Sequence, residues 1–354
     1  NNRRNHHKKS RVIVSHPIDV TASGAVSLGA DIVCDGFLKD AKARVQTHIH
    51  TDHLHEFATS KGLQTIILSE PTRQLLCHLF NADLPYRSNI KSLDYDKSFT
   101  LNETNVTLIS NAHMLGSVQV AVERQDGMRL GYSGDFAWPL DKVIEVDALV
   151  LDSTYGSPSN IRQYDQDQCE ESFLSLVHTH IGQGPMHIHA HRGTLQRALQ
   201  ILNGETECSL LGSEKLCREV EIYSEFGYAI APLTNADTVE GKEAISSGRF
   251  IRFYGTGDRK PTDVGNALTI KLSAYFAKPD NPVNEYSDRS FCVAISNHAD
   301  FNGTLDYARE SGAKYIVTDN SRGGKGYDLA VELRTRLGIE AKPSSNRVSY
   351  SWGE

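Results

Sequence analysis

The motif HIHTDH at residues 48–53 constrains this chain more than any other segment. A short strand is predicted over residues 43–47, and the first two histidines of the motif leave it on the same side. Asp52 and His53 follow directly and can turn toward a neighbouring point. Imidazole and carboxylate without thiolate are typical of catalytic rather than structural zinc sites. The motif therefore predicts a loop that supplies ligands to two metal ions.

Two further residues stand where additional ligands would be needed. His113 comes just after a predicted strand over residues 106–110, and Asp135 comes shortly after another over residues 129–132. Taken singly, a loop histidine or a Gly-Asp turn is more often structural than functional. Several strand ends can converge on one rim of a sheet, however, so both residues together with the motif predict a complete ligand set.

The pattern of predicted elements changes once along the chain. Residues 11–152 contain short β-rich runs separated by turns, whereas helices of about ten residues alternate with single strands from Gln166 onward, which argues for βαβ units and a parallel sheet. Strands and helices follow again from Ser290, with predicted strands at residues 315–318 and 348–352. The loop Ala277–Asp288, with two prolines, is the predicted linker.

Composition narrows the class of protein. The 354 residues contain no apolar run near the roughly 20 residues that a membrane helix requires, so we expect no membrane association. Residues 1–10 are polar and basic and are expected to form a flexible end without signal-peptide character. The six cysteines are scattered without a C-x-x-C pair, which favours a reducing cytoplasm. The net charge of −7 weakly disfavours a nucleic-acid partner unless bound cations offset phosphate repulsion.

The order of these motifs resembles the metallo-β-lactamase fold, and three further segments resemble its β-CASP branch. These are His113-Met114-Leu115-Gly116-Ser117, Leu151-Asp152-Ser153-Thr154-Tyr155-Gly156 and Ser296-Asn297-His298-Ala299-Asp300. That branch comprises nucleases, including ribonuclease J, the cleavage and polyadenylation factor nucleases, Artemis-type enzymes and a ligase-associated DNA exonuclease group. The resemblance implies an α/β protein, a four-layer αββα sandwich at residues 11–160 and 286–354 with a β-CASP α/β domain inserted at residues 161–285.

The resemblance also implies roles for individual residues. His48, His50 and His113 would hold one metal, Asp52 and His53 the other, and Asp135 would bridge the two. Zn²⁺ is the expected ion, with Mn²⁺ as the alternative. Asp152 would steady the site beside the metals, and His298 would protonate the leaving oxygen.

One position departs from the family pattern. Many β-CASP enzymes, especially those that process RNA, have a last metal-binding histidine after the strand that here ends at Thr318, and this chain has Asp319 instead. Artemis-like DNA nucleases also lack that histidine, so the change favours DNA as the substrate. Asp319 could itself bind the second metal, because carboxylate oxygen is an acceptable ligand.

Candidate substrate contacts lie in three other segments. A second histidine cluster, His187-Ile188-His189-Ala190-His191, has the same alternation but no adjacent carboxylate pair, and plain strand-end structure is the favoured interpretation. Phosphate groups are expected to meet cationic or imidazole side chains at His191, Arg192, Lys271, Arg322 and Lys325. The last two stand in a Gly-rich run, for which a loop with solvated charges is the alternative interpretation.

The favoured interpretation is a two-metal nuclease that hydrolyses phosphodiester bonds of DNA, as an exonuclease in repair or processing. A bridging hydroxide would attack and His298 would act as the general acid. Three alternatives stay open: an RNA endo- or exonuclease of the mRNA 3′-end processing type, a small-molecule metallohydrolase such as a thioesterase or lactonase, and a nucleic-acid-binding subunit with a dead site. Nucleic acid and repair or processing proteins are the expected partners, and the sequence sets no oligomeric state.

Overall fold

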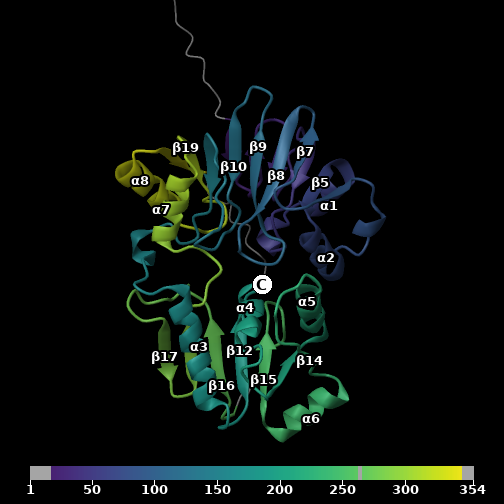
Figure 1. Ribbon diagram of the computed structural model, residues 1–354, viewed down its shortest axis with the longest axis vertical. Helices are drawn as coiled ribbons and strands as arrows, with labels where there is room; N and C mark the ends of the chain where they lie inside the picture. Colours follow the sequence, from purple (N-terminus) through teal and green to yellow (C-terminus); the bar gives the residue numbers. More distant parts are fainter. Residues whose placement is uncertain (1–16, 262–264, 345–354) are drawn as a thin grey trace, which may run out of the picture.

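The computed structural model describes residues 17–261 and 265–344. The chain forms two lobes, one with two sheets and one with a single sheet (Figure 1). The predicted α/β class is confirmed. The basic end at residues 1–10 and the strands predicted at residues 11–14 and 348–352 lie outside the described residues. No helix within the described ranges is long and apolar enough to cross a membrane.

The first sheet of the larger lobe has six strands in the order of the chain. They are β1 (Ile18–Val20), β2 (Val26–Leu28), β3 (Ile32–Cys34), β4 (Ala43–Val45), β5 (Thr65–Ser69) and β6 (Ile90–Leu93). The pairs β1/β2 and β2/β3 are antiparallel, and the pairs from β3 to β6 are parallel. Helices α1 (Phe57–Leu63) and α2 (Glu70–Leu79) connect the last strands. Ser69 caps α2 by accepting from the N–H of Thr72 at 3.3 Å, which fixes where that helix begins.

The second sheet packs face to face with the first. Its order is β20-β19-β11-β10-β9-β8-β7. The strands are β7 (Ser98–Leu101), β8 (Thr104–Ser110), β9 (Val118–Glu123), β10 (Arg129–Tyr132), β11 (Ala148–Leu151), β19 (Tyr315–Thr318) and β20 (Glu340–Pro343). Val45 and Ile67 of the first sheet share one apolar cluster with Val120 and Val150 of the second. Side chains that alternate along each strand thus fill the space between the two sheets.

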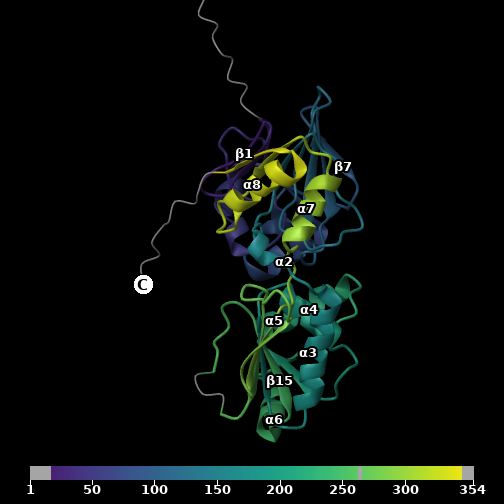
Figure 2. The same cartoon turned by 90° about the vertical axis from the view of Figure 1, so that its left-hand side faces the viewer.

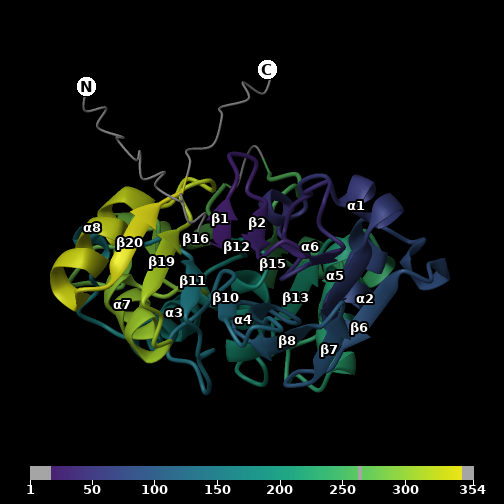
Figure 3. The ribbon, with the colours of Figure 1, turned by 90° about the horizontal axis from the view of Figure 1, so that it is seen from above.

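Helices cover the outer faces of these sheets. Seen from above, α7 (Phe301–Glu310) and α8 (Gly326–Leu337) lie on one side and α1 and α2 on the other (Figure 3). Ile66 and Leu68 of β5 face outward and share a cluster with Leu75 of α2, while Ile67 between them faces inward. The predicted four-layer αββα sandwich is therefore present.

The smaller lobe is built on a third sheet of order β14-β13-β15-β12-β16-β18-β17. Its strands are β12 (Met186–Ala190), β13 (Ser209–Gly212), β14 (Thr234–Asn235), β15 (Phe250–Tyr254), β16 (Leu268–Leu272), β17 (Val283–Ser287) and β18 (Ser290–Val293). Its helices are α3 (Gln166–His180), α4 (Thr194–Ile201), α5 (Glu214–Glu225) and α6 (Val239–Ser247). Figure 2 shows α3 and α4 together on one side of this sheet. All pairs except β17/β18 are parallel, as the alternation of helices and strands predicts.

The predicted linker at Ala277–Asp288 is wrong. Residues 283–287 form the edge strand β17, which pairs antiparallel with β18, and β18 pairs with β16 inside the third sheet. The division between the lobes therefore follows β18 at Val293 and not residue 285. The two prolines precede the edge strand, where a missing N–H costs no ladder hydrogen bond.

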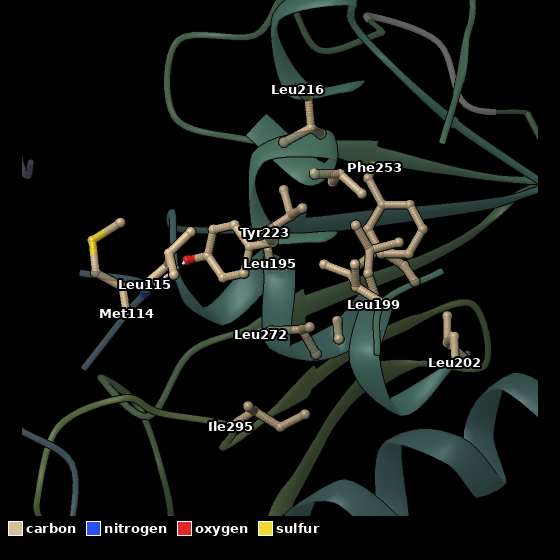
Figure 4. Packing of buried hydrophobic residues seen from close by; sticks show 14 of the residues in the cluster. Met114, Leu115, Leu195, Leu199, Leu202, Leu216, Tyr223, Phe253, Leu272 and Ile295 are labelled. Carbon is tan, nitrogen blue, oxygen red and sulfur yellow. Dashed lines mark hydrogen bonds between the residues drawn. The ribbon is translucent and has the colours of Figure 1, made fainter. Parts of the chain in front are cut away.

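The lobes touch through an apolar contact near the predicted site. Figure 4 shows Met114 and Leu115, from the loop after β8, beside Tyr223 of α5. The N–H of Leu115 donates to the hydroxyl of the buried Tyr223 at 3.2 Å, and both residues belong to one apolar cluster. The loop that contains His113 is thus attached to the smaller lobe.

Candidate metal centre

Buried polar side chains hold the backbone of the motif at residues 48–53 through hydrogen bonds. Arg44 of β4 is fully buried and donates to the carbonyls of His53 and His55, each at 2.8 Å. Gln46 donates to the carbonyl of His48 at 2.7 Å. Burial lowers the pKa of Arg44 to about 10, so the guanidinium stays charged at neutral pH. These contacts fix the loop backbone and thereby the direction of its histidines.

One group of ligand atoms joins this loop to the ends of two other strands. Ligand atoms of His48, His50, His113 and Asp135 lie within 4.8 Å of one another. Nε2 of His113 is 3.2 Å from Nδ1 of His50, and Oδ2 of Asp135 is 3.6 Å from Nε2 of His48. Two nitrogens bound to one tetrahedral zinc are ~3.3 Å apart. The separations therefore suit one metal ion among these four residues.

His53 extends the cluster on the other side of Asp135. Its Nε2 lies 3.3 Å from Oδ2 of Asp135 and 3.8 Å from Oδ2 of Asp52, whose side chain is 43% exposed. The buried Nε2 atoms of His48 and His53 have no hydrogen-bond partner among the described residues. A buried polar atom without a partner is costly unless it has another ligand, so these residues fit a metal centre. Asp135 lies between the two groups, as a bridging ligand would.

The histidines fall into two kinds by the direction in which the pKa of each is shifted. Burial, with the neighbouring imidazoles, lowers the pKa of His48 and of His50 well below the ordinary value, and burial with the charge of His298 lowers the pKa of His113 to about 4. These three rings are neutral at pH 7 and keep a lone pair for a cation. Burial and Arg322 also lower the pKa of His53, but the carboxylates of Asp135 and Asp52 outweigh them and raise it to about 10.

Asp35 is a part of the site that the sequence interpretation missed. Its Oδ2 accepts from Nδ1 of His53 at 2.8 Å and from the hydroxyl of Thr47 at 2.5 Å, and its Oδ1 accepts from the N–H of Thr47 at 2.8 Å. A carboxylate can only accept, so Nδ1 of His53 carries a proton and Nε2 faces Asp135. The available signal was an aspartate directly after a strand, the position that Asp152 and Asp319 also occupy.

Asp152 and His298 form a pair beside the ligands. Nδ1 of His298 donates to Oδ2 of Asp152 at 3.0 Å, while Oδ1 of Asp152 accepts from the N–H of Thr154 at 2.8 Å. Burial lowers the pKa of His298, but the hydrogen bond and charge of Asp152 outweigh it and raise the pKa. Nε2 of His298 lies 3.9 Å from Oδ2 of Asp135. The ring can therefore keep a proton and present it next to the ligand cluster.

Asp319 and Arg322 differ from their expected roles. The guanidinium of Arg322 pairs with Asp319 through Nη1 and donates to the carbonyl of Gly24, and only 10% of its side chain is exposed. Oδ1 of Asp319 also accepts from the N–H and hydroxyl of Ser321. Asp319 belongs to none of the candidate metal-binding groups of the described residues. The carboxylate of Asp319 is engaged by Arg322, and both residues line the cleft.

The remaining predicted contacts are spread over the cleft and its surroundings. The guanidinium of Arg192 makes two hydrogen bonds of 2.9 Å to buried Glu219, while the Arg192 carbonyl lies 3.2 Å from Nε2 of His50. His191 lines the cleft and contacts the hydroxyl of Thr256 at 3.0 Å. Lys271 and Lys325 are exposed but do not line the cleft.

The second histidine cluster follows the favoured structural interpretation. His187 lies 2.9 Å from the hydroxyl of Tyr254, and the ring of His189 stacks on Tyr254 with centroids 4.9 Å apart. Neither residue belongs to a candidate metal-binding group among the described residues. These histidines pack against their neighbours on the third sheet.

The ligand cluster opens into a cleft between the lobes of about 500 Å³. Its walls come from the motif loop, from the ends of β11 and β19, and from the ends of parallel strands in the third sheet. Asp135, Asp152 and His298 lie on this wall together with exposed Asp52. The site is thus accessible to a ligand that enters between the lobes.

Comparisons with known proteins agree with this geometry. A sequence model of the beta-lactamase superfamily domain matches residues 36–205. An uncharacterized protein in the lig 3′ region of Acidianus ambivalens is 30% identical over 112 residues, which cover 31% of this chain and 79% of that protein. An RNase J-like protein of Methanocaldococcus jannaschii is 30% identical over 145 residues, 35% of this chain and 34% of that protein.

A solved structure gives the same fold at low sequence identity. A protein of unknown function from Enterococcus faecalis V583 superposes with a TM-score of 0.57 at 13% identity, covering 88% of this chain and 82% of that one. The family match, the relatives and the convergent histidines and aspartates show that the chain is a metal-dependent hydrolase of the metallo-β-lactamase superfamily.

Proposed function

We propose that this protein is a two-metal phosphodiesterase that cleaves nucleic-acid strands. One observation carries the proposal: Asp135 lies between a group of three neutral histidines and a second group around His53, and buried nitrogens in both groups have no hydrogen-bond partner among the described residues. Two cations held there would lower the pKa of a bound water to about 7 and offset the charge of a phosphate. Zn²⁺ is the proposed ion, because the ligands are imidazole and carboxylate.

The protein's own residues supply the other parts of the reaction. Asp35 holds the ring of His53, Arg44 holds the loop carbonyls, and neither touches the substrate. His298, with its raised pKa, donates a proton to the leaving alkoxide. Asp152 keeps that ring oriented toward Asp135.

The second lobe argues for a polymer substrate. The cleft is lined by five strand ends or loops of that lobe as well as by the larger lobe, which is more surface than a lactone or thioester would need. We favour DNA, in an exonuclease role in repair, because Asp319 replaces the histidine usual in RNA-processing members and is occupied by Arg322. RNA is the second candidate, because one relative is an RNase J-like protein.

The test is cleavage by the metal-loaded full chain. Single-stranded and duplex DNA and RNA, labelled at the 5′ or the 3′ end, are incubated with Zn²⁺ or Mn²⁺. We expect metal-dependent cleavage that is lost in the double variant Asp52→Ala with His53→Ala, while circular dichroism stays unchanged. His178→Ala, at an exposed histidine of α3 that does not line the cleft, is the control. Undiminished cleavage by the double variant, or hydrolysis of a lactone or thioester without cleavage of any strand, contradicts the proposal.

A further inference from the structure

Exposed aromatic rings stand at two places beside the metal cleft. Phe80, the residue after α2, is 41% exposed, and Tyr275, in the turn after β16, is 73% exposed. Both line the cleft. Large apolar side chains exposed beside a catalytic cleft mark a surface for a ligand more often than isolated exposed residues do.

The ring of Phe80 lies beside Lys215, for which the described residues provide no ion-pair partner. Nζ of Lys215 lies 5.4 Å from the centre of the Phe80 ring, and the guanidinium carbon of Arg192 lies 6.0 Å from it. Arg192 is paired with Glu219, whereas Lys215 forms no ion pair within the described part of the chain. The ring and the free ammonium together offer a flat face and a positive charge.

Tyr275 also lies near a lysine, because its neighbour Phe276 is close to Lys271. Its ring meets that of Phe276 edge to face with centroids 4.7 Å apart, and Phe276 is 58% exposed. Nζ of Lys271 lies 5.7 Å from the Phe276 ring, and Lys271 has no ion-pair partner among the residues that the structure describes. A second exposed ring thus lies close to a second free cation.

The topology puts these two places on either side of the ligand cluster. Lys215 follows β13 and Tyr275 follows β16, and the sheet order β13-β15-β12-β16 separates them by three strand spacings, ~14 Å. Between them β12 leads to Arg192, whose carbonyl contacts His50. A chain laid along the carboxyl edges of these strands would pass both rings and the metal centre.

We propose, on the basis of the phosphodiesterase function above, that Phe80 and Tyr275 are stacking sites for unpaired bases, so that the substrate is a single strand or a single-stranded end. Aromatic rings and lysines along a groove are the two components with which proteins hold single strands. In a duplex the base faces are stacked on one another and unavailable to such rings. The rings therefore select unpaired strands, while Lys215 in the cleft, and Lys271 outside it beside Phe276, attract the phosphates.

The experiment separates stacking from charge. Binding of fluorescein-labelled oligothymidylate, of an abasic strand of equal length and of a blunt duplex is measured by anisotropy with the full chain in EDTA, so that no cleavage is required. We expect the abasic strand to bind at least tenfold more weakly, about the effect of one stacked base. Phe80→Leu and Tyr275→Leu, which keep apolar volume without a ring, should each reduce the difference between the two strands.

Two variants serve as controls. Tyr86→Leu removes a ring that is 89% exposed but does not line the cleft, and it should keep the wild-type preference for bases. Lys215→Gln should weaken binding of both strands alike. The slope of the logarithm of the binding constant against the logarithm of the salt concentration should become shallower by about one. Equal affinity for the thymidylate and abasic strands, or a duplex bound as tightly as the single strand, overturns the proposal.

Failure of this inference is distinguishable from failure of the proposed function. Metal-dependent hydrolysis of bis(4-nitrophenyl) phosphate by the wild-type protein reports the metal chemistry without a nucleic-acid chain. Hydrolysis of this ester without any preference for bases in binding overturns the stacking sites alone. Base-dependent binding without hydrolysis of any phosphodiester overturns the phosphodiesterase function and retains the single-strand surface.

Discussion

Nδ1 of His298 lies 3.0 Å from Oδ2 of Asp152, and this contact holds the pKa of His298 above its ordinary value despite burial. Asp152→Asn removes the negative charge and should lower that pKa. A proton donor is lost as the pH rises through its pKa, so the alkaline limb of the kcat profile should move to lower pH in the variant. Asp152→Glu should restore part of the shift. An unchanged alkaline limb in Asp152→Asn would show that His298 is not the donor.

Zinc binding should release a proton from His53. The carboxylates of Asp135 and Asp52 raise its pKa to about 10 in the metal-free protein, so the ring is protonated at pH 7.5 and must lose a proton to bind a metal. Calorimetric titration with Zn²⁺ in two buffers of different ionisation enthalpy measures this release, which we expect to be about one proton. His53→Asn should abolish it. Equal release by the variant would assign the proton to another group.

The same shift gives a pH dependence of stability without metal. A histidine whose pKa is raised on folding contributes stability that is present below the unfolded value of about 6.5 and is lost as the pH rises through the folded value. The free energy of unfolding of the metal-free protein should therefore fall between pH 6.5 and pH 10. Urea titrations at several pH values measure this free energy, and its decrease with pH should be smaller in His53→Asn. A slope that is the same in both proteins contradicts the assignment.

The pair of Arg322 and Asp319 should behave as a buried ion pair. Arg322→Met leaves the 6% exposed carboxylate of Asp319 without its counter-ion and should cost ~3–5 kcal/mol of unfolding free energy. The double variant with Asp319→Asn removes both charges and should recover a substantial part of that loss. Urea unfolding of the four proteins of the cycle gives the coupling. Additive losses would mean that the two side chains do not stabilise each other.

Tyr223 should link the lobes through a single hydroxyl. Tyr223→Phe leaves the buried N–H of Leu115 without its partner and should cost about 1–3 kcal/mol. Thermal unfolding measures the loss, with Tyr228→Phe, which is 43% exposed, as the control. Because Leu115 belongs to the same loop as His113, the metal affinity should also fall in Tyr223→Phe. A wild-type melting temperature would show that the N–H finds another partner.

The sequence was informative wherever a ligand follows a strand within a motif. His48, His50, His113 and Asp135 are placed by the ends of β4, β8 and β10, so their order in the chain was enough to predict that they meet. The start of helix α3 at Gln166 was predictable, because Asp165 and Gln168 form a capping box there.

Other features depend on contacts between distant segments. Asp35 follows β3, a strand of three residues that is too short to show alternation, and its role depends on His53 and Thr47. Arg322 stands in a Gly-rich run that predicts a solvated loop, but the carbonyl of Gly24 and the carboxylate of Asp319 bury it. The end of the inserted lobe was misplaced because only pairing with β16 shows that β18 belongs to the third sheet.

Asp35, Asp152 and Asp319 are each the first residue beyond a buried strand, so the register of the sheets sets their positions. The segments that follow them can change in length without moving these carboxylates, because the strands before them stay anchored in the core. Insertions and deletions in those loops should therefore be tolerated, whereas a shift of one residue within β3, β11 or β19 would move one of these aspartates away from its partners. Related chains can thus reshape the approach to the metals while the inorganic chemistry stays the same.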